Sequence, residues 1–216
     1  MDKLPNQSCQ RRTKPVNSSA SRRLRIWIVL AIALLACLIL YALFRTPAPW
    51  ARRLVRAAAL FGYSSIFLTI LSHEYMRDMK RLFGQTFLKV HHVLAVVGLV
   101  LIVLHPLTLA LLTQNPSVFV PRFDSLDLFL TLGGRPALYL FLIAVLAALL
   151  RRRIRNVWRF VHWLNYVAFG LAFVHGLRMG PDASQGLLAL VWVAMFAVVL
   201  LVFLRKRLGR RGAVRG

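Results

Sequence analysis

Acidic residues and cysteines are scarce in this sequence, and each shortage excludes a kind of chemistry. Six Asp and Glu among 216 residues leave little material for carboxylate chemistry, and we predict no catalytic side chain. The two cysteines, Cys9 in a polar segment and Cys37 in an apolar one, provide neither a disulfide framework nor a CxxC metal or redox site. No GxGxxG, Walker or other nucleotide-phosphate motif occurs.

Apolar residues, in contrast, are abundant and occur in long runs. They make up 59% of the chain, and the mean hydropathy is +0.66. A membrane-spanning helix needs about 20 predominantly apolar residues, and six runs qualify as candidates: residues 26–44, 54–72, 88–112, 128–150, 157–177 and 187–204. The fourth is the least clear, because Gly133, Gly134 and Pro136 interrupt its start. We predict an all-α membrane protein, a six-transmembrane-helix bundle over residues 26–204.

Lys and Arg flank the apolar runs. The net charge is +23, but no soluble domain remains to carry a nucleic-acid-binding face. Residues 1–25 hold seven Lys and Arg, the loop 73–89 four, the loop 151–159 five, and residues 205–216 six. By the positive-inside rule, these segments are cytoplasmic. The protein is then a multi-pass protein of the cell (inner) membrane, with a disordered basic tail over 1–25 and a basic tail over 205–216, both in the cytoplasm.

Two features complicate this topology. A basic start followed by an apolar run is also found in secretory signals, but the nineteen apolar residues of 26–44 are long for one. We therefore expect a retained helix. Four arginines fall on the predicted outer side, against the rule: Arg45, Arg52, Arg53 and Arg56.

Histidines lie near the ends of two predicted spans. The third span reads KVHHVLAVVGLVLIVLHPL over residues 89–107, with His91 and His92 at one end and His105 at the other. The fifth contains HWLNYVAFGLAFVHG, with His162 and His175. At 1.5 Å rise per residue, each helix separates its histidines by about 20 Å. Both spans run from inside to outside, so the histidines match in depth.

Four histidines at two depths are suited to hold two haems. Neutral imidazole is a good ligand for iron, and histidine is a common axial ligand of haem. We predict two stacked b-type haems between the third and fifth helices, with His91, His105, His162 and His175 as iron ligands. Gly98 and Gly170 lie between these ligands, where a missing side chain would let a flat macrocycle approach. Zinc fits less well, because ligands so far apart along each helix cannot surround one ion.

The geometry of an ideal helix supports the pair of iron ligands predicted in the third span but not the pair in the fifth. On an ideal helix, the 14-residue step from His91 to His105 returns to within about 40° of the starting face. The 13-residue step from His162 to His175 misses by about 140°, unless that span is overwound or bent. His92 lies about 100° from His91 around the helix, which favours His91 as the ligand. His73, beside a charged loop, is interpreted as an interfacial residue.

These two segments resemble the haem-bearing third and fifth helices of the ferric reductase-like transmembrane domain family, which includes NADPH oxidases and ferric reductases. That family typically spaces its ligands by 14 and 13 residues, and the segment GLAFVHG is similar to the end of its fifth helix. The chain also resembles the related haem-binding membrane subunit of the periplasmic methionine sulfoxide reductase system. That subunit usually has arginine where His91 and His92 stand, so the two-haem oxidoreductases are the nearer resemblance.

The resemblance implies electron transfer across the membrane, one electron at a time. The family's flavin and nicotinamide region is not recognisable here, so we expect a separate cytoplasmic flavin reductase, or a membrane quinol, as the donor. The acceptor outside the cytoplasm would be ferric iron, oxygen or a partner protein. Whether the chain is an oxidoreductase or an electron-transfer subunit is left open. Three other interpretations are also left open. They are a subunit of a periplasmic reductase, a haem-free transporter or channel with a histidine relay, and a membrane anchor whose histidines bond neighbouring helices.

Two groups of residues have no assigned role at this stage. His92 occupies a position that is often basic in the resembling family, where contact with a haem propionate or a lipid headgroup is plausible. The outward arginines could pair with haem propionates or attract an anionic ferric chelate. They could equally extend along the membrane interface to keep their charges in water.

Overall fold

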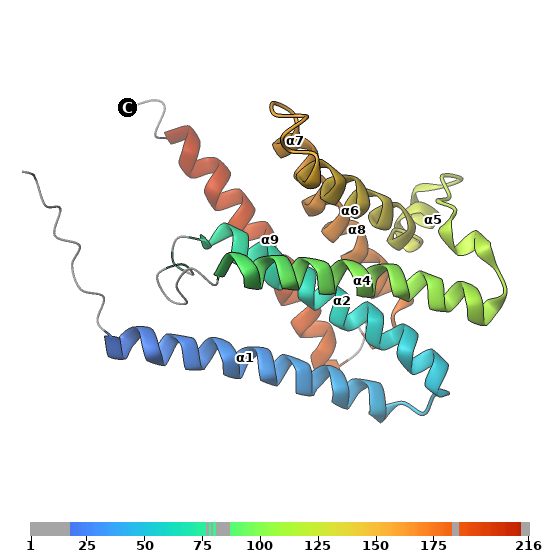
Figure 1. Ribbon diagram of the computed structural model, residues 1–216. Coiled ribbons are helices and arrows are strands. Elements are labelled where there is room, and N and C mark those ends of the chain that lie inside the picture. The colour runs from blue at the N-terminus through green and yellow to red at the C-terminus, as the bar shows by residue number, and fades with distance from the viewer. Residues whose placement is uncertain (1–17, 77, 79, 81–86, 183–185, 213–216) are drawn as a thin grey trace, which may run out of the picture.

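The computed structural model describes residues 18–76, 78, 80, 87–182 and 186–212, and every regular element in these ranges is helical. The long helices are those that the apolar runs predict (Figure 1). In chain order the elements are α1 (Ser18–Arg45), α2 (Trp50–Glu74), α4 (Phe87–Thr113), the 3₁₀ turn η2 (Pro116–Phe119), α5 (Leu126–Thr131), α6 (Gly134–Leu149), α7 (Trp158–His162), α8 (Leu164–Met179) and α9 (Gly186–Gly212).

Five helices of the described chain are long and apolar enough to cross a membrane, which confirms a multi-pass membrane protein. They are Arg22–Arg45, Trp50–Glu74, Lys89–Thr113, Trp158–Met179 and Gly186–Arg205. Large apolar side chains on their outer surfaces are exposed, Leu34 to 72% and Leu190 to 68%, as expected of a face that meets lipid. Helix α6 is apolar but has only 16 residues, or about 24 Å of length.

Some predicted boundaries were wrong. Helix α1 begins at Ser18, so residues 18–25 are helical and do not belong to a disordered tail. Helix α9 continues through the predicted tail to Gly212, while residues 1–17 and 213–216 of the two tails lie outside the described residues. The predicted fourth span consists of two helices, because α5 ends at Thr131 and α6 begins at Gly134.

Glycines bring α2 and α4 into close contact. A Cβ placed on Gly98 of α4 would lie 3.0 Å from Ile66 Cδ1 and 3.2 Å from Ser65 Cβ of α2. A Cβ on Gly62 of α2 would lie 3.2 Å from two side chains of α4. Small residues allow membrane helices to approach closely. Gly98 therefore serves the contact with α2, and the prediction that it makes room for a macrocycle was wrong.

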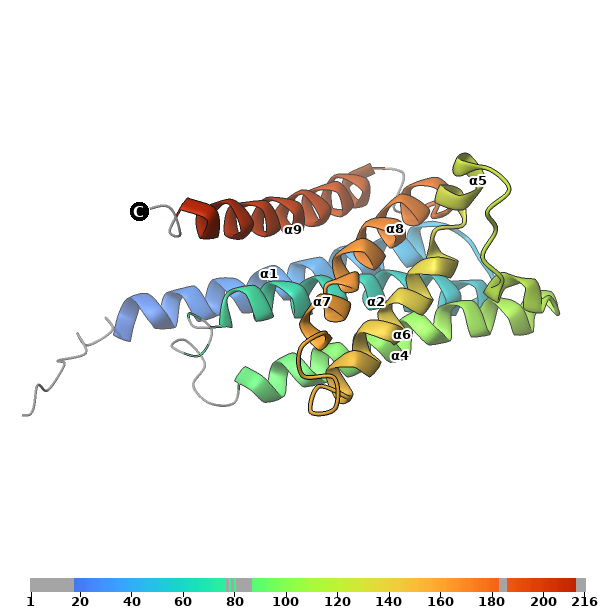
Figure 2. The same cartoon turned by 90° about the horizontal axis from the view of Figure 1, so that it is seen from above.

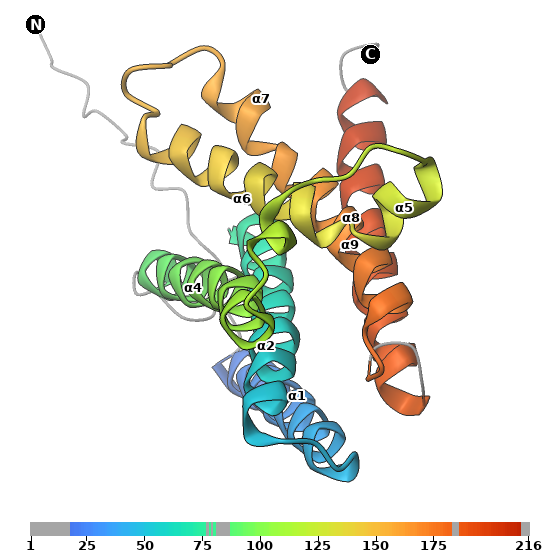
Figure 3. The same ribbon diagram turned by 90° about the vertical axis from the view of Figure 1, so that its right-hand side faces the viewer.

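Aromatic rings join α2 to α8 and α9. Tyr63 of α2 stacks on Phe169 of α8, with ring centroids 4.4 Å apart, and on Trp192 of α9 at 3.9 Å. Figure 3 shows α2 between α4 on one side and α8 and α9 on the other. The bundle thus has two halves, with α4 against α2 and with α7 and α8 against α6.

The helix directions agree with an antiparallel arrangement of neighbours. In Figure 2 the starts of α1 and α4 and the ends of α2 and α9 lie toward the same side of the bundle. The segment from η2 to α5 lies at the opposite end, beyond the end of α4.

Candidate functional site

Two cavities lie between the halves of the bundle, and each contains one histidine from α4 and one from α7 or α8. The inner cavity, of about 950 Å³, is lined by His91 and His162. The outer cavity, of about 750 Å³, is lined by His105 and His175. We name them after the predicted orientation. Both volumes are typical of sites for organic ligands, and the structure brings the four predicted ligands together as two pairs.

The outer pair is the better defined. The rings of His105 and His175 have their centroids 6.4 Å apart and their planes at 65°. Nδ1 of His105 lies 3.0 Å from the carbonyl oxygen of Val55, and Nδ1 of His175 lies 2.8 Å from that of Thr131. A carbonyl can only accept a hydrogen bond, so each Nδ1 carries the proton. Each Nε2 therefore keeps an unprotonated lone pair for a metal.

Gly134 provides the space for the ring of His175. A Cβ on Gly134 would lie 2.7 Å from Cδ2 and 2.9 Å from Nε2 of that ring. Gly176, which follows the histidine, makes the same kind of space for Trp192, whose Cζ2 would be 2.8 Å away. The sequence indicated Gly134 only as an interruption of a span, because its role depends on a contact between α6 and α8.

The inner pair has the same hydrogen-bonding pattern. Nδ1 of His162 lies 3.1 Å from the carbonyl oxygen of Ala144, and Nδ1 of His91 lies 3.0 Å from Oγ of Ser72. The Ser72 hydroxyl donates to the carbonyl of Thr69 at 2.8 Å, so its oxygen accepts from His91. The amide nitrogen of Asn165 is also 3.3 and 3.5 Å from the His162 ring nitrogens, but its shorter bond, 2.9 Å, goes to the His162 carbonyl.

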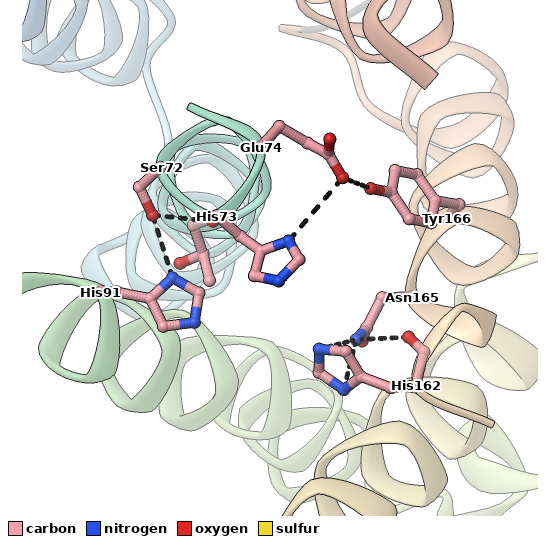
Figure 4. A network of polar contacts seen from close by, with 8 residues as sticks. Ser72, His73, Glu74, His91, His162, Asn165 and Tyr166 are labelled. Carbon is pink, nitrogen blue, oxygen red and sulfur yellow. Dashed lines mark hydrogen bonds and ion pairs between the residues drawn. The ribbon is translucent and has the colours of Figure 1, made fainter. Parts of the chain in front are cut away.

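All four histidines thus have a hydrogen-bond acceptor at Nδ1, which favours the tautomer with the lone pair on Nε2; at His162 the Asn165 amide nitrogen also lies 3.5 Å from Nε2. The acceptors lie on neighbouring helices. Helix α2 accepts the hydrogen bonds of both histidines of α4, and the α5–α6 segment accepts those of His162 and His175. Such partners fix ring orientation and raise ligand basicity in metal sites. Figure 4 shows the rings of His91 and His162 on the two sides of the inner cavity.

A break after His162 supplies part of the rotation that the 13-residue step lacks. Helix α7 ends at His162 and α8 begins at Leu164. Around the break, Trp163 N donates toward the carbonyl of Phe160 at 3.1 Å, and Tyr166 N donates to Trp163 at 3.0 Å. These i→i−3 bonds are typical of 3₁₀ winding, which turns about 120° per residue and not 100°. The extra rotation brings His162 and His175 toward a common face.

His92 and His73, the two remaining histidines near the inner cavity, have different environments. His92 is exposed and is not among the residues that line the inner cavity. His73 is 52% exposed, and its ring centroid lies 6.0 Å from that of His91. His73 also lines the inner cavity, together with Glu74 and Tyr166. The sequence did not predict that cluster, whose members come from helices far apart in the chain.

The outward arginines have different environments. Arg56 forms a largely buried ion pair with Asp182, whose side chain is 7% exposed, and also donates to the carbonyl of Ala42 at 3.2 Å. The guanidinium of Arg53 lies over the rings of Phe44 and Trp50, at 5.2 and 5.4 Å from their centroids. Arg52 is exposed and lines the outer cavity with Arg135. Arg52 is thus the outward arginine best placed to meet an anionic group at that cavity.

Within the described residues, no group of three or more His, Cys, Asp or Glu side chains is arranged to hold a metal ion. The outer cavity offers two imidazoles, and the three imidazoles that line the inner cavity are not gathered around one point, whereas a structural zinc site uses four protein ligands. Comparison of the chain with models of known protein families, with curated proteins and with solved structures finds no match.

Proposed function

We propose that the protein transfers electrons across a membrane through two b-type haems, each held by two histidines. The observation that carries this proposal is the outer pair, His105 of α4 and His175 of α8, whose ring centroids lie 6.4 Å apart with the planes at 65°. With metal–nitrogen bonds of about 2 Å on each side of one ion, two imidazole centroids lie about 6 Å apart. The residues present therefore fit a bis-histidine iron.

The repetition of the arrangement supports a second haem. His91 and His162 line a cavity of similar size and also have acceptors for their Nδ1 protons. Two axial imidazoles per site match the coordination that histidine gives to haem iron. When bound, a haem supplies reversible one-electron chemistry at its iron.

The chain would position these groups and separate them from water. The outer cavity has mostly apolar walls, and the buried ring of Phe141 lines both cavities. A macrocycle in either cavity would therefore contact this ring. Burial and the hydrogen bonds to the ligating histidines are the means by which a protein adjusts a haem's reduction potential.

We infer that α6 completes a sixth crossing, because α7 and α8 follow it and run parallel to α4 from the inner to the outer histidine level. Its 16 residues suffice if the membrane is locally thin or α5 contributes. The charge distribution would then put the inner cavity at the cytoplasmic face of the cell membrane. Electrons would pass from a cytoplasmic reductase or a quinol to ferric iron, oxygen or a partner outside, as in the ferric reductase-like family.

Haem content tests the proposal directly. The chain is expressed with ample haem supply, purified, and assayed as the pyridine haemochrome together with its absorption spectrum. We expect close to two haem b per chain, both six-coordinate and low-spin. His105→Ala and His175→Ala should each lose one haem and keep the other. Absence of haem in the native chain would overturn the proposal and favour a haem-free transporter.

A further inference from the structure

Glu74 is the one acidic residue within the five long apolar helices of the described chain. It ends α2, its side chain is 14% exposed, and it lines the inner cavity. Figure 4 shows the hydroxyl of Tyr166 and the ring of His73 directed at its carboxylate. Tyr166 donates a hydrogen bond to Oε1, and Nδ1 of His73 lies 3.7 Å from the same oxygen.

Ionisable side chains inside membrane segments are rare and are candidates for functional sites by default. Glu74 shares its cavity with the inner histidine pair, so its charge lies close to any group held there. The other titratable or charged side chains that line this cavity are His73, Tyr75, Asp78, His91, Arg159, His162 and Tyr166. Asp78 is exposed, so water screens its charge more than that of Glu74.

We propose that Glu74 is a proton-binding site coupled to the redox group of the inner cavity. When that group gains one electron from the donor, the carboxylate of Glu74 takes one proton from water on the cytoplasmic side and becomes a carboxylic acid. When the electron moves on, Glu74 releases the proton. This inference rests on the proposed function.

The physical reason is charge balance at a largely buried carboxylate, whose side chain is 14% exposed. Apart from the propionates, the iron and porphyrin ring of a ferric haem with two neutral imidazoles carry one positive charge, and those of the ferrous form carry none. Reduction therefore removes a cation that stabilises the carboxylate, and at reduced effective dielectric this interaction is larger than in water. A largely buried carboxylate that loses a neighbouring positive charge binds a proton more readily. The Tyr166 hydroxyl keeps its acceptor in both states, because a carboxyl oxygen accepts hydrogen bonds whether or not the group is protonated.

The test is a set of redox titrations of the purified full chain at a series of pH values, each monitored by absorption spectroscopy. The His105→Ala variant, which should keep only the inner haem, assigns the inner midpoint potential. We expect this potential to fall as pH rises, by up to one proton per electron, while the outer haem's potential stays nearly constant. In Glu74→Gln the pH dependence of the inner haem should disappear, with the haem content unchanged.

Two further variants keep the test decisive. Glu74→Asp retains a carboxylate and should retain the pH dependence, which covers the case in which Glu74→Gln does not assemble. Asp78→Asn removes the exposed carboxylate of the same cavity and should leave the dependence unchanged. Equal pH dependence in the native chain and Glu74→Gln, or none in the native chain, would overturn the inference alone. Absence of haem would overturn the proposed function with it.

Discussion

The rings of His105 and His175 both line the outer cavity with their centroids 6.4 Å apart, although 70 residues separate them in the chain. Each has its Nδ1 proton bonded to a backbone carbonyl of a third segment, Val55 for one and Thr131 for the other. The pair is therefore fixed from both sides, with its Nε2 atoms unprotonated. The same relationship recurs at the inner cavity, and four predictions follow from the contacts of these two sites.

The neighbours His91 and His92 should differ sharply in their effect on haem content. His91 lines the inner cavity and is bonded to Ser72, whereas His92 is exposed and does not line it. We expect His91→Ala to contain only the outer haem and His92→Ala to contain both. Haem-to-protein ratios of the two variants decide this. Loss of haem in His92→Ala alone would mean that His92 is the ligand.

Gly134→Ala should damage the outer site. The added methyl group would lie within 3.0 Å of two atoms of the His175 ring, and the ring would have to move. We expect loss or a weakened hold of the outer haem and a destabilisation of about 1–3 kcal/mol from overpacking, measured by haem content and thermal unfolding in detergent. Gly170→Ala is the matched control, because Gly170 lines neither cavity and its added Cβ would lie 3.7 Å from Phe196 of α9. Equal haem occupancy in both variants would contradict this account.

Ser72→Ala should weaken the inner site without removing a ligand. The Nδ1 proton of His91 then loses its acceptor, and loss of such a partner typically lowers metal affinity about 10–100-fold. We expect faster loss of the inner haem to a competing apoprotein, with the outer haem unaffected. Ser64→Ala provides the control, because Ser64 is also a buried serine of α2 but lines neither cavity. If the two variants lost haem at the same rate, the Ser72 bond would have no role in ligation.

The Arg56–Asp182 pair should stabilise the outer end of the bundle. Both side chains are largely buried, and Arg56 Nε lies 2.6 Å from Asp182 Oδ2. Removing one partner leaves a charge without compensation, at a cost of about 3–5 kcal/mol when burial is complete. We expect Arg56→Leu to lower the thermal midpoint clearly, and Arg56→Leu with Asp182→Leu to recover much of the loss.

The exposed pair Arg122–Asp124 is the control for this comparison, since both of its side chains are more than half exposed. Such pairs contribute little to stability because water screens them. Arg122→Ala should therefore leave the thermal midpoint unchanged. If Arg122→Ala and Arg56→Leu had equal effects, burial would not be the reason for the contribution of Arg56.

The helical class and the membrane-spanning runs were determined by the sequence. Length and apolarity alone distinguish a membrane helix from other segments, because the bilayer requires internal hydrogen bonding over about 20 residues. The same reasoning found His91, His105, His162 and His175, since ionisable residues are conspicuous in such runs. It also favoured His91 over His92, because a 14-residue step is close to a whole number of turns.

Only the tertiary structure decided how these residues meet. The 13-residue step in the second pair needed a break at Trp163, which depends on local winding and is not visible in the apolar pattern. The sequence indicated Gly98 as a position that makes room for a macrocycle and Gly134 only as an interruption of a span. In the structure Gly98 packs against α2, and Gly134 makes room for the His175 ring, because the effect of a missing Cβ depends on which helix faces it. The acceptors of the four Nδ1 protons are three backbone carbonyls and one serine hydroxyl. Backbone carbonyls occur at every position, so sequence cannot single out those that folding places beside an imidazole.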